Sequence, residues 1–380
     1  MNIISYVRTF GNKTFSELPF NYVDGLIFSQ LSYVNFYLAI PDSGFVKLKT
    51  LKESKQINNK DFYFGSVDAK NNEKILKLMV KSRRYKNVQV GYSRYSFDAE
   101  VNKQFAAVTF IMPNNIGFIS YRGTDITMVG WREDLYIAYR NAIPGAEEAV
   151  DYIKMVTKLF LGNFYVGGHS KGGNLAIYSC LNMYKKLYPR LLNVFSYDGP
   201  GFKDSIKEHP HYEMVKDKVV KFLTSNDMIG VVYNNIENAK IVYSNGILLG
   251  GHDPFRWQVD LVKVDFVYSK NRSYMSKKYE EALMTWLNEV SDEDKEVVVH
   301  VIFEMMGEAK NVYDLLLKGG RLILNGKKTW DQYKPQQRIQ ARETFKKLGR
   351  YFLAAYSPKR FLIEKFSSKN VEPKTPNNTN

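Results

Sequence analysis

The chain has 380 residues, of which 44% are hydrophobic and 24% charged, and this balance is typical of soluble globular proteins with one large domain or two to three smaller ones. Cys180 is the only cysteine, which excludes intrachain disulfides and cysteine-rich metal sites. No stretch approaches the roughly 20 uncharged apolar residues of a membrane-spanning helix, and no secretory signal is recognisable, so we expect a cytoplasmic protein.

The positive charge is concentrated at the C-terminal end. The net charge is +15, and from Lys318 onwards fifteen Lys or Arg residues face four acidic residues, a net of +11. The rest of the chain is therefore close to neutral. A basic appendage indicates an anionic partner, either lipid headgroups or nucleic acid, or else a solvated face that aids solubility.

The first part of the chain is predicted to be helical. Val23, Ile27 and Leu31 follow helical periodicity. Residues 45–90 are charged and indicate helices and loops. We therefore expect an N-terminal helical segment over residues 1–84.

The middle of the chain, residues 85–270, has the pattern of a mixed α/β domain. Two apolar runs at 105–112 and 116–121 are joined by Pro-Asn-Asn, which predicts a hairpin. Further short strands then alternate with helices, which favours a mostly parallel sheet covered on both faces. The strands are expected at 164–166, 193–197, 219–224, 240–243 and 259–268, and the first two helices at 145–161 and from about 171.

Beyond residue 270 the pattern becomes helical. We expect a helical, basic C-terminal extension over residues 271–366 and a disordered tail over 367–380, which has little apolar content. The helices are predicted at 273–290, 292–308, 310–318 and 335–356.

The densest motif lies at residues 168–172, Gly-His-Ser-Lys-Gly. It matches G-x-S-x-G, with a predicted strand before it and a helix after it, which is the context of a nucleophile elbow. The flanking glycines allow a tight turn that projects the Ser170 hydroxyl. The backbone N–H of Lys171, at the start of the helix, could then hold an oxyanion. The alternative is a glycine-rich turn in which Ser170 only caps the helix.

A serine nucleophile needs a histidine base and an orienting carboxylate. Of the five histidines, one lies inside the elbow and should point away from the hydroxyl, two lie in a polar linker, and one lies on a late helix. His252 remains, because it follows the predicted strand at 240–243 and a glycine-containing loop. The five are His169, His209, His211, His252 and His300.

Two aspartates lie between the serine and His252 and directly follow predicted strands. In proteins with a nucleophile elbow, the strand after the elbow usually passes beside the nucleophile, and the following strand carries the acid. This order favours Asp227, which follows the run Val-Val-Lys-Phe-Leu-Thr-Ser-Asn. Asp198 would then line the wall of the site or belong to a turn. It remains the alternative candidate for the triad acid.

These motifs resemble a known family. Residues 118–125, followed by Trp131 and Asp134, resemble the FRGT…W..D block that stands upstream of the elbow in class 3 lipases. Residues 225–229 are similar to the asparagine–aspartate–apolar stretch that supplies the acid of those enzymes. The opening LPFNYVDGLIFSQLSY, DGPGF at 198–202 and GHDPFRW at 251–257 resemble a little-characterised bacterial family related to them.

The resemblance covers roughly residues 15–270 and implies an α/β-hydrolase fold. It also implies that the backbone N–H of Thr124 is a second oxyanion donor beside that of Lys171. The sequence departs from class 3 lipases at Lys171, where they usually carry leucine.

We therefore expect a serine hydrolase that cleaves carboxylic esters, plausibly lipid or lysolipid esters, and acts in lipid metabolism. Ser170, His252 and Asp227 would form the catalytic triad, and the chemistry needs no cofactor. The alternative is a catalytically idle hydrolase fold that binds membrane or nucleic acid through its basic C-terminal region. No base-reading element accompanies the basic residues, which argues against nucleic acid.

The last predicted helix has two contrasting sides. At 100° per residue, Ala341, Phe345, Leu348 and Phe352 share one face, and basic residues spread over the other. Such a helix can lie on an anionic membrane, at the inner face of the cell membrane for a cytoplasmic protein. The same apolar stripe could instead dock the helix on the catalytic domain.

Overall fold

The structure is a computed structural model that describes residues 1–380 except 64–67, 237, 247, 307–329, 331–333 and 356–380. Its centre is an eight-stranded sheet whose strands follow one another in chain order from β1 to β8. Neighbouring strands are antiparallel from β1 to β4 and parallel from β4 to β8. The strands are β1 Phe45–Lys47, β2 Gln89–Asp98, β3 Lys103–Ile111, β4 Gly117–Tyr121, β5 Phe164–His169, β6 Leu191–Tyr197, β7 Val219–Thr224 and β8 Lys240–Val242.

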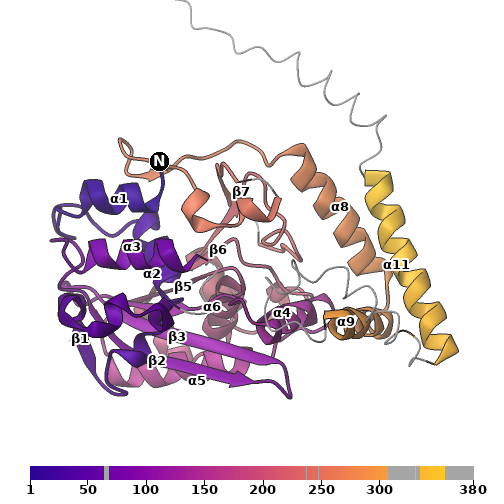
Figure 1. Ribbon diagram of the computed structural model, residues 1–380, viewed down its shortest axis with the longest axis horizontal. Coiled ribbons are helices and arrows are strands. Elements are labelled where there is room, and N and C mark those ends of the chain that lie inside the picture. The colour runs from indigo at the N-terminus through magenta and orange to yellow at the C-terminus, as the bar shows by residue number, and fades with distance from the viewer. Residues whose placement is uncertain (64–67, 237, 247, 307–329, 331–333, 356–380) are drawn as a thin grey trace, which may run out of the picture.

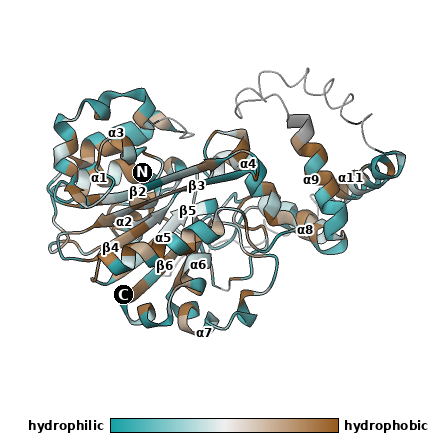
Figure 2. Ribbon diagram, turned by 90° about the horizontal axis from the view of Figure 1, so that it is seen from below, coloured by the Kyte–Doolittle hydropathy of each residue, from teal (hydrophilic) through white to brown (hydrophobic). Residues whose placement is uncertain are grey.

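The helices cover both faces of this sheet and one end of the molecule (Figure 1). Helices α1 to α3 pack on one face, where they share a hydrophobic core with the strands, and α5 and α6 pack on the other. Helices α8, α9 and α11 gather beyond α4 (Figure 2). The bounds are α1 Ile3–Phe10, α2 Tyr22–Leu31, α3 Ala69–Met79, α4 Met128–Leu135, α5 Ala146–Leu159, α6 Lys171–Asn182, α7 Tyr212–Val215, α8 Tyr274–Glu289, α9 Asp292–Met306 and α11 Pro335–Ala355.

The predicted hairpin is confirmed, because β3 and β4 pair in antiparallel register from Ala107 opposite Tyr121 to Ile111 opposite Gly117. Two expectations were wrong. The segment predicted as helices and loops contributes β1, which pairs with β2. The single strand predicted at 259–268 is instead a small antiparallel pair, β9 Val259–Asp260 and β10 Asp265–Phe266. The predicted helix at 310–318 and the predicted disordered tail lie outside the described residues.

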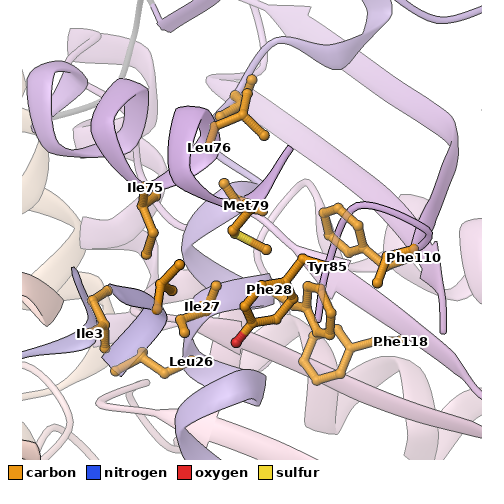
Figure 3. Packing of buried hydrophobic residues seen from close by; sticks show 14 of the residues in the cluster. Ile3, Leu26, Ile27, Phe28, Ile75, Leu76, Met79, Tyr85, Phe110 and Phe118 are labelled. Atoms are coloured by element: carbon orange, nitrogen blue, oxygen red, sulfur yellow. The ribbon is translucent and has the colours of Figure 1, made fainter. Parts of the chain in front are cut away.

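Aromatic packing joins the N-terminal segment to the sheet (Figure 3). The ring of Phe28 on α2 stacks on Phe110 of β3 at 4.9 Å between centroids and also contacts Phe118 of β4. Burying such large apolar side chains contributes about 1.5–3 kcal/mol each. The N-terminal helices are therefore an integral layer of the fold.

A buried ion pair holds the same layer. Arg84 contacts Asp24 through Nε at 2.9 Å and Nη2 at 2.5 Å, and both side chains are 0% exposed. Tyr85 donates its hydroxyl hydrogen to Asp24 at 2.6 Å, and Arg84 also donates to the carbonyl of Leu18 at 2.7 Å. These hydrogen bonds compensate for burying the two charges.

The last helix docks through its apolar side. Ala341 and Thr344 of α11 are buried, and the indole of Trp286 on α8 donates to the carbonyl of Thr344 at 3.2 Å. Arg342 and Arg350 face solvent. The apolar face of this helix therefore packs against the rest of the protein, which was the alternative to membrane binding. Among the helices that the structure describes, none is long and apolar enough to cross a membrane.

Candidate active site

Ser170 sits in a strained turn between β5 and α6. Its backbone has φ 59° and ψ −133°, a region that residues other than glycine rarely adopt. Its N–H donates to the carbonyl of Tyr197 at 2.9 Å, and its carbonyl accepts from the N–H of Gly173 at 2.8 Å. This is the strand–turn–helix geometry of a nucleophile elbow, as the sequence predicted.

The glycines beside the serine are required by close backbone contacts. A Cβ at Gly168 would lie 2.3 Å from the backbone carbon of Gly172, and a Cβ at Gly172 would lie 2.2 Å from the carbonyl oxygen of Tyr121. Neither backbone group can move without disturbing β4 or α6. The turn is therefore tight because both positions lack a side chain.

His252 and Asp198 form a hydrogen-bonded pair. The Nδ1 of His252 lies 2.7 Å from Oδ2 of Asp198, and Asp198 is 0% exposed. Burial lowers the pKa of His252 below its ordinary 6.5, so the imidazole is neutral at pH 7. Nδ1–H then donates to Asp198, which leaves the lone pair of Nε2 free to accept a proton.

Among the described residues no hydrogen bond joins Asp227 to this imidazole, contrary to the sequence-based expectation, although the charge of Asp227 acts to raise the pKa of His252. Its Oδ1 accepts from the N–H groups of Ile229 at 2.7 Å and Gly230 at 2.8 Å. The backbone of Asp198 has φ 55°, and this left-handed bend at the end of β6 brings its carboxylate to the histidine. Chain order alone gives no sign of such a bend.

The two aspartates nevertheless interact with each other. Burial, and next the nearby charge of Asp198 and a hydrogen bond between the two carboxyl groups, raise the pKa of Asp227 well above its ordinary value. Burial also raises the pKa of Asp198 to about 6, against the hydrogen bond from Asp227 and that from the N–H of Thr224. Asp198 is therefore ionised at pH 7.

His169 packs beneath the base. Its ring centroid lies 4.3 Å from that of His252, and its Nε2 lies 2.9 Å from the carbonyl oxygen of His252. Burial lowers the pKa of His169 well below 6.5. A neutral ring with hydrogen on Nε2 donates to that carbonyl and holds the loop that carries His252. Sequence reasoning missed this role, since it expected His169 to point away from the serine.

Thr124 and Asp134 lie beside the serine. The Thr124 hydroxyl donates to Oδ2 of Asp134 at 2.5 Å, and the Trp131 indole donates to the carbonyl of Asp125 at 3.1 Å. These bonds close the loop after β4 and fix the backbone at Thr124. Burial raises the pKa of Asp134 to about 6.

The backbone and the side chain of Lys171 have different roles. Its N–H is one of the four at the start of α6 that have no acceptor within the helix. Its ammonium group is buried and lies 2.5 Å from Glu133, 2.8 Å from the carbonyl of Gln104 and 3.0 Å from the Gln104 amide oxygen. The lysine that replaces the leucine of class 3 lipases thus ties α6 to α4 and β3.

A cavity of about 210 Å³ brings most of the expected site residues together. Thr124, Ser170 and His252 line it, and Asp134 and His169 complete its polar wall. We call it the histidine cavity. No hydrogen bond joins Ser170 to His252 among the described residues, and such bonds are often long before substrate binds. The described residues contain no cluster of three or more His, Cys, Asp or Glu side chains that could hold a metal ion.

Comparison with known proteins assigns the chain to a family. The Mbeg1-like family model matches residues 79–304, more than half of the chain. The chain belongs to the Mbeg1-like family. The match spans β2 to most of α9, and so includes the elbow, both aspartates and His252.

Two solved structures are similar to the chain. A mutant form of MDLA from Penicillium cyclopium has 13% identity and a TM-score of 0.38, with 70% of this chain and 88% of that chain covered. The Lip2 lipase from Yarrowia lipolytica has 11% identity and a TM-score of 0.34, with 60% of this chain and 80% of that chain covered. The search of curated proteins finds no match. With its mostly parallel sheet and its elbow, this Mbeg1-like chain has an α/β-hydrolase fold resembling class 3 lipases.

Proposed function

We propose that this protein is a serine hydrolase that cleaves carboxylic esters, with lipid esters as its substrate class. The observation that carries the proposal is the strained Ser170 at an elbow that shares a cavity with a neutral, carboxylate-bound His252. A glycine-rich turn that merely capped a helix would need neither the strain nor the histidine.

In the proposed mechanism, Nε2 of His252 takes the Ser170 proton as the hydroxyl oxygen bonds to the ester carbonyl carbon. The backbone N–H groups of Thr124 and Lys171 stabilise the oxyanion. The carbon–oxygen bond to the alcohol then breaks, and His252 gives its proton to the departing oxygen. Water, deprotonated by His252, releases the acid and restores Ser170.

We assign the orienting carboxylate to Asp198. Its 2.7 Å contact fixes the hydrogen of His252 on Nδ1 and stabilises the imidazolium that forms during the reaction. Asp227 supports Asp198 through the hydrogen bond between their carboxyl groups and does not touch the reacting atoms. This replaces the assignment to Asp227 that chain order favoured.

Labelling with a fluorophosphonate probe tests the proposal, since the probe reacts only with an activated serine. Wild-type protein should be labelled and Ser170→Ala should not. Ser179→Ala, a change in the same helix α6 at a buried serine bonded to the carbonyl of Ala176, is the matched control and should be labelled like the wild type. Absence of labelling in correctly folded wild-type protein would favour the idle hydrolase fold.

A further inference from the structure

A second cavity shares part of its wall with the site. It has a volume of about 300 Å³, and its walls include Leu283 and Leu287 of α8, Ile302 of α9 and Leu348 of α11. We call it the helical cavity. The size lies at the lower end of the range for small-molecule sites, and the apolar lining is typical of them.

Ser170 lies in the wall of both cavities. Ser170, Trp131, Asp134 and Ile229 line both the helical cavity and the histidine cavity. An ester whose carbonyl carbon reaches the Ser170 hydroxyl can therefore extend into both spaces, with one part on each side of the serine.

The position of the base decides which part lies where. His252 lines the histidine cavity and is not among the residues of the helical cavity. In the proposed mechanism His252 must protonate the departing alcohol oxygen, so the alcohol part has to lie on its side. The acyl part then lies in the apolar helical cavity.

We infer that the helical cavity is the acyl-chain site, and that the preferred substrates are esters with long acyl chains. This inference rests on the proposed esterase function. It adds that the chain-length preference comes from helices α8, α9 and α11, which pack beyond the central sheet (Figure 2). Leu348 makes α11, the last described helix, part of the substrate site.

The wall is held in place by contacts along its length. The Trp286 indole bonds the carbonyl of Thr344 between α8 and α11, and Arg132 of α4 donates to the carbonyl of Phe303 of α9 at 3.2 Å. The rings of Tyr279 and Phe352 lie 5.7 Å apart between α8 and α11. The three helices therefore form a defined surface for an apolar chain.

The test compares p-nitrophenyl esters from acetate to dodecanoate. In wild-type protein kcat/KM should rise about threefold to fourfold for each added methylene until the cavity is full. Leu348→Trp fills the cavity, and the ratio of kcat/KM for the decanoate ester to that for the acetate ester should fall at least about tenfold. Leu353→Trp on the same helix, where the side chain is 76% exposed, is the matched control and should keep the wild-type ratio.

Calorimetric titration with dodecanoate separates this inference from the proposed function, because binding needs no turnover. Wild type, Ser170→Ala and Leu353→Trp should bind dodecanoate, and Leu348→Trp should bind at least about tenfold more weakly. If Leu348→Trp does not fold, Ala138→Leu, at another residue of the cavity wall, fills the cavity instead.

The outcomes are distinct. Hydrolysis of the acetate ester with the same chain-length ratio in Leu348→Trp and Leu353→Trp would overturn the acyl site and leave the esterase proposal standing. Dodecanoate binding without hydrolysis of any ester would overturn the esterase proposal while the cavity still binds an acyl chain. Absence of dodecanoate binding in wild type would overturn the acyl site.

Discussion

At the residue scale, the site depends on which of two neighbouring aspartates contacts the histidine. Asp198 contacts the imidazole of His252, and Asp227, whose pKa burial raises well above its ordinary value, interacts with Asp198. The sequence placed both aspartates correctly after strands, and elimination among five histidines led to His252. It could not rank the aspartates, because the choice depends on the φ of 55° at Asp198, a backbone angle that chain order does not encode.

The first prediction separates the two carboxyl groups. Asp198→Asn should lower kcat about 10⁴-fold, because an amide can hold the imidazole in the wrong tautomer. Asp227→Asn should change kcat by less than about tenfold, since its amide can still form a hydrogen bond with Asp198. Steady-state kinetics on one p-nitrophenyl ester measures both effects. The reverse ranking would assign the orienting carboxylate to Asp227.

The second prediction concerns pH. Burial places the pKa of His252 below 6.5 and that of Asp198 at about 6. Protonation of His252 removes the base, and protonation of Asp198 removes the acceptor of Nδ1–H, so both act in the same direction. A pH profile of kcat/KM should be flat from about pH 7 to 8 and should fall about tenfold or more per unit well below pH 6. An optimum below pH 5 would contradict this assignment.

At the scale of elements, strands made mostly of apolar residues were predictable, and the strand with polar residues along its whole length was not. β7 was predicted with its observed bounds, Val219–Thr224. β2 was missed because polar residues run through it and its pairing register shifts between Gly91 and Arg94. β9 and β10 were predicted as one strand because the turn between them contains an apolar residue, Val264, whose φ is 57°.

Helix α11 carries the third prediction. Its apolar side packs on α8 and its exposed arginines face solvent, so membrane binding would be electrostatic, without insertion of the helix. We expect full-length protein to pellet with phosphatidylglycerol vesicles at low salt, with about 1 kcal/mol from each basic residue near the surface. Arg342→Glu with Arg350→Glu should weaken this binding, and salt should abolish it.

The control for α11 is a second pair of exposed basic residues outside the helix. Lys185→Glu with Lys186→Glu makes the same change in charge on the linker after α6. Equal loss in both double variants would indicate attraction by overall charge rather than by α11. Failure of the wild type to pellet would refute membrane contact through this helix.

At the scale of the whole molecule, the N-terminal segment belongs to the hydrolase domain and is not an attachment to it. Its charged and polar composition concealed part of this link, because a buried ion pair and one short strand add to the apolar packing. Asp24 and Arg84 are 60 positions apart, and sequence periodicity contains no signal for a contact of that range.

The fourth prediction tests this link. Arg84→Met should lower the free energy of unfolding by about 3–5 kcal/mol, because it leaves Asp24 buried without its partner. Arg83→Met is the matched control, since Arg83 pairs with Glu17 at the surface, where the two side chains are 59% and 41% exposed. Its cost should stay below about 1 kcal/mol. Equal losses in urea unfolding of the two variants would show that the buried pair does not hold the fold.

The central claim is that Ser170 and His252 act together as nucleophile and base. Its most direct test is the rate of p-nitrophenyl ester hydrolysis by Ser170→Ala and His252→Ala, with His211→Ala as the histidine control, because His211 bonds the carbonyl of Leu181 away from the site. The account predicts that each of the first two variants loses about 10⁴-fold or more in kcat, that the double variant loses no more than either, and that the control keeps its activity. Near-normal turnover by His252→Ala, or losses that multiply in the double variant, would contradict it.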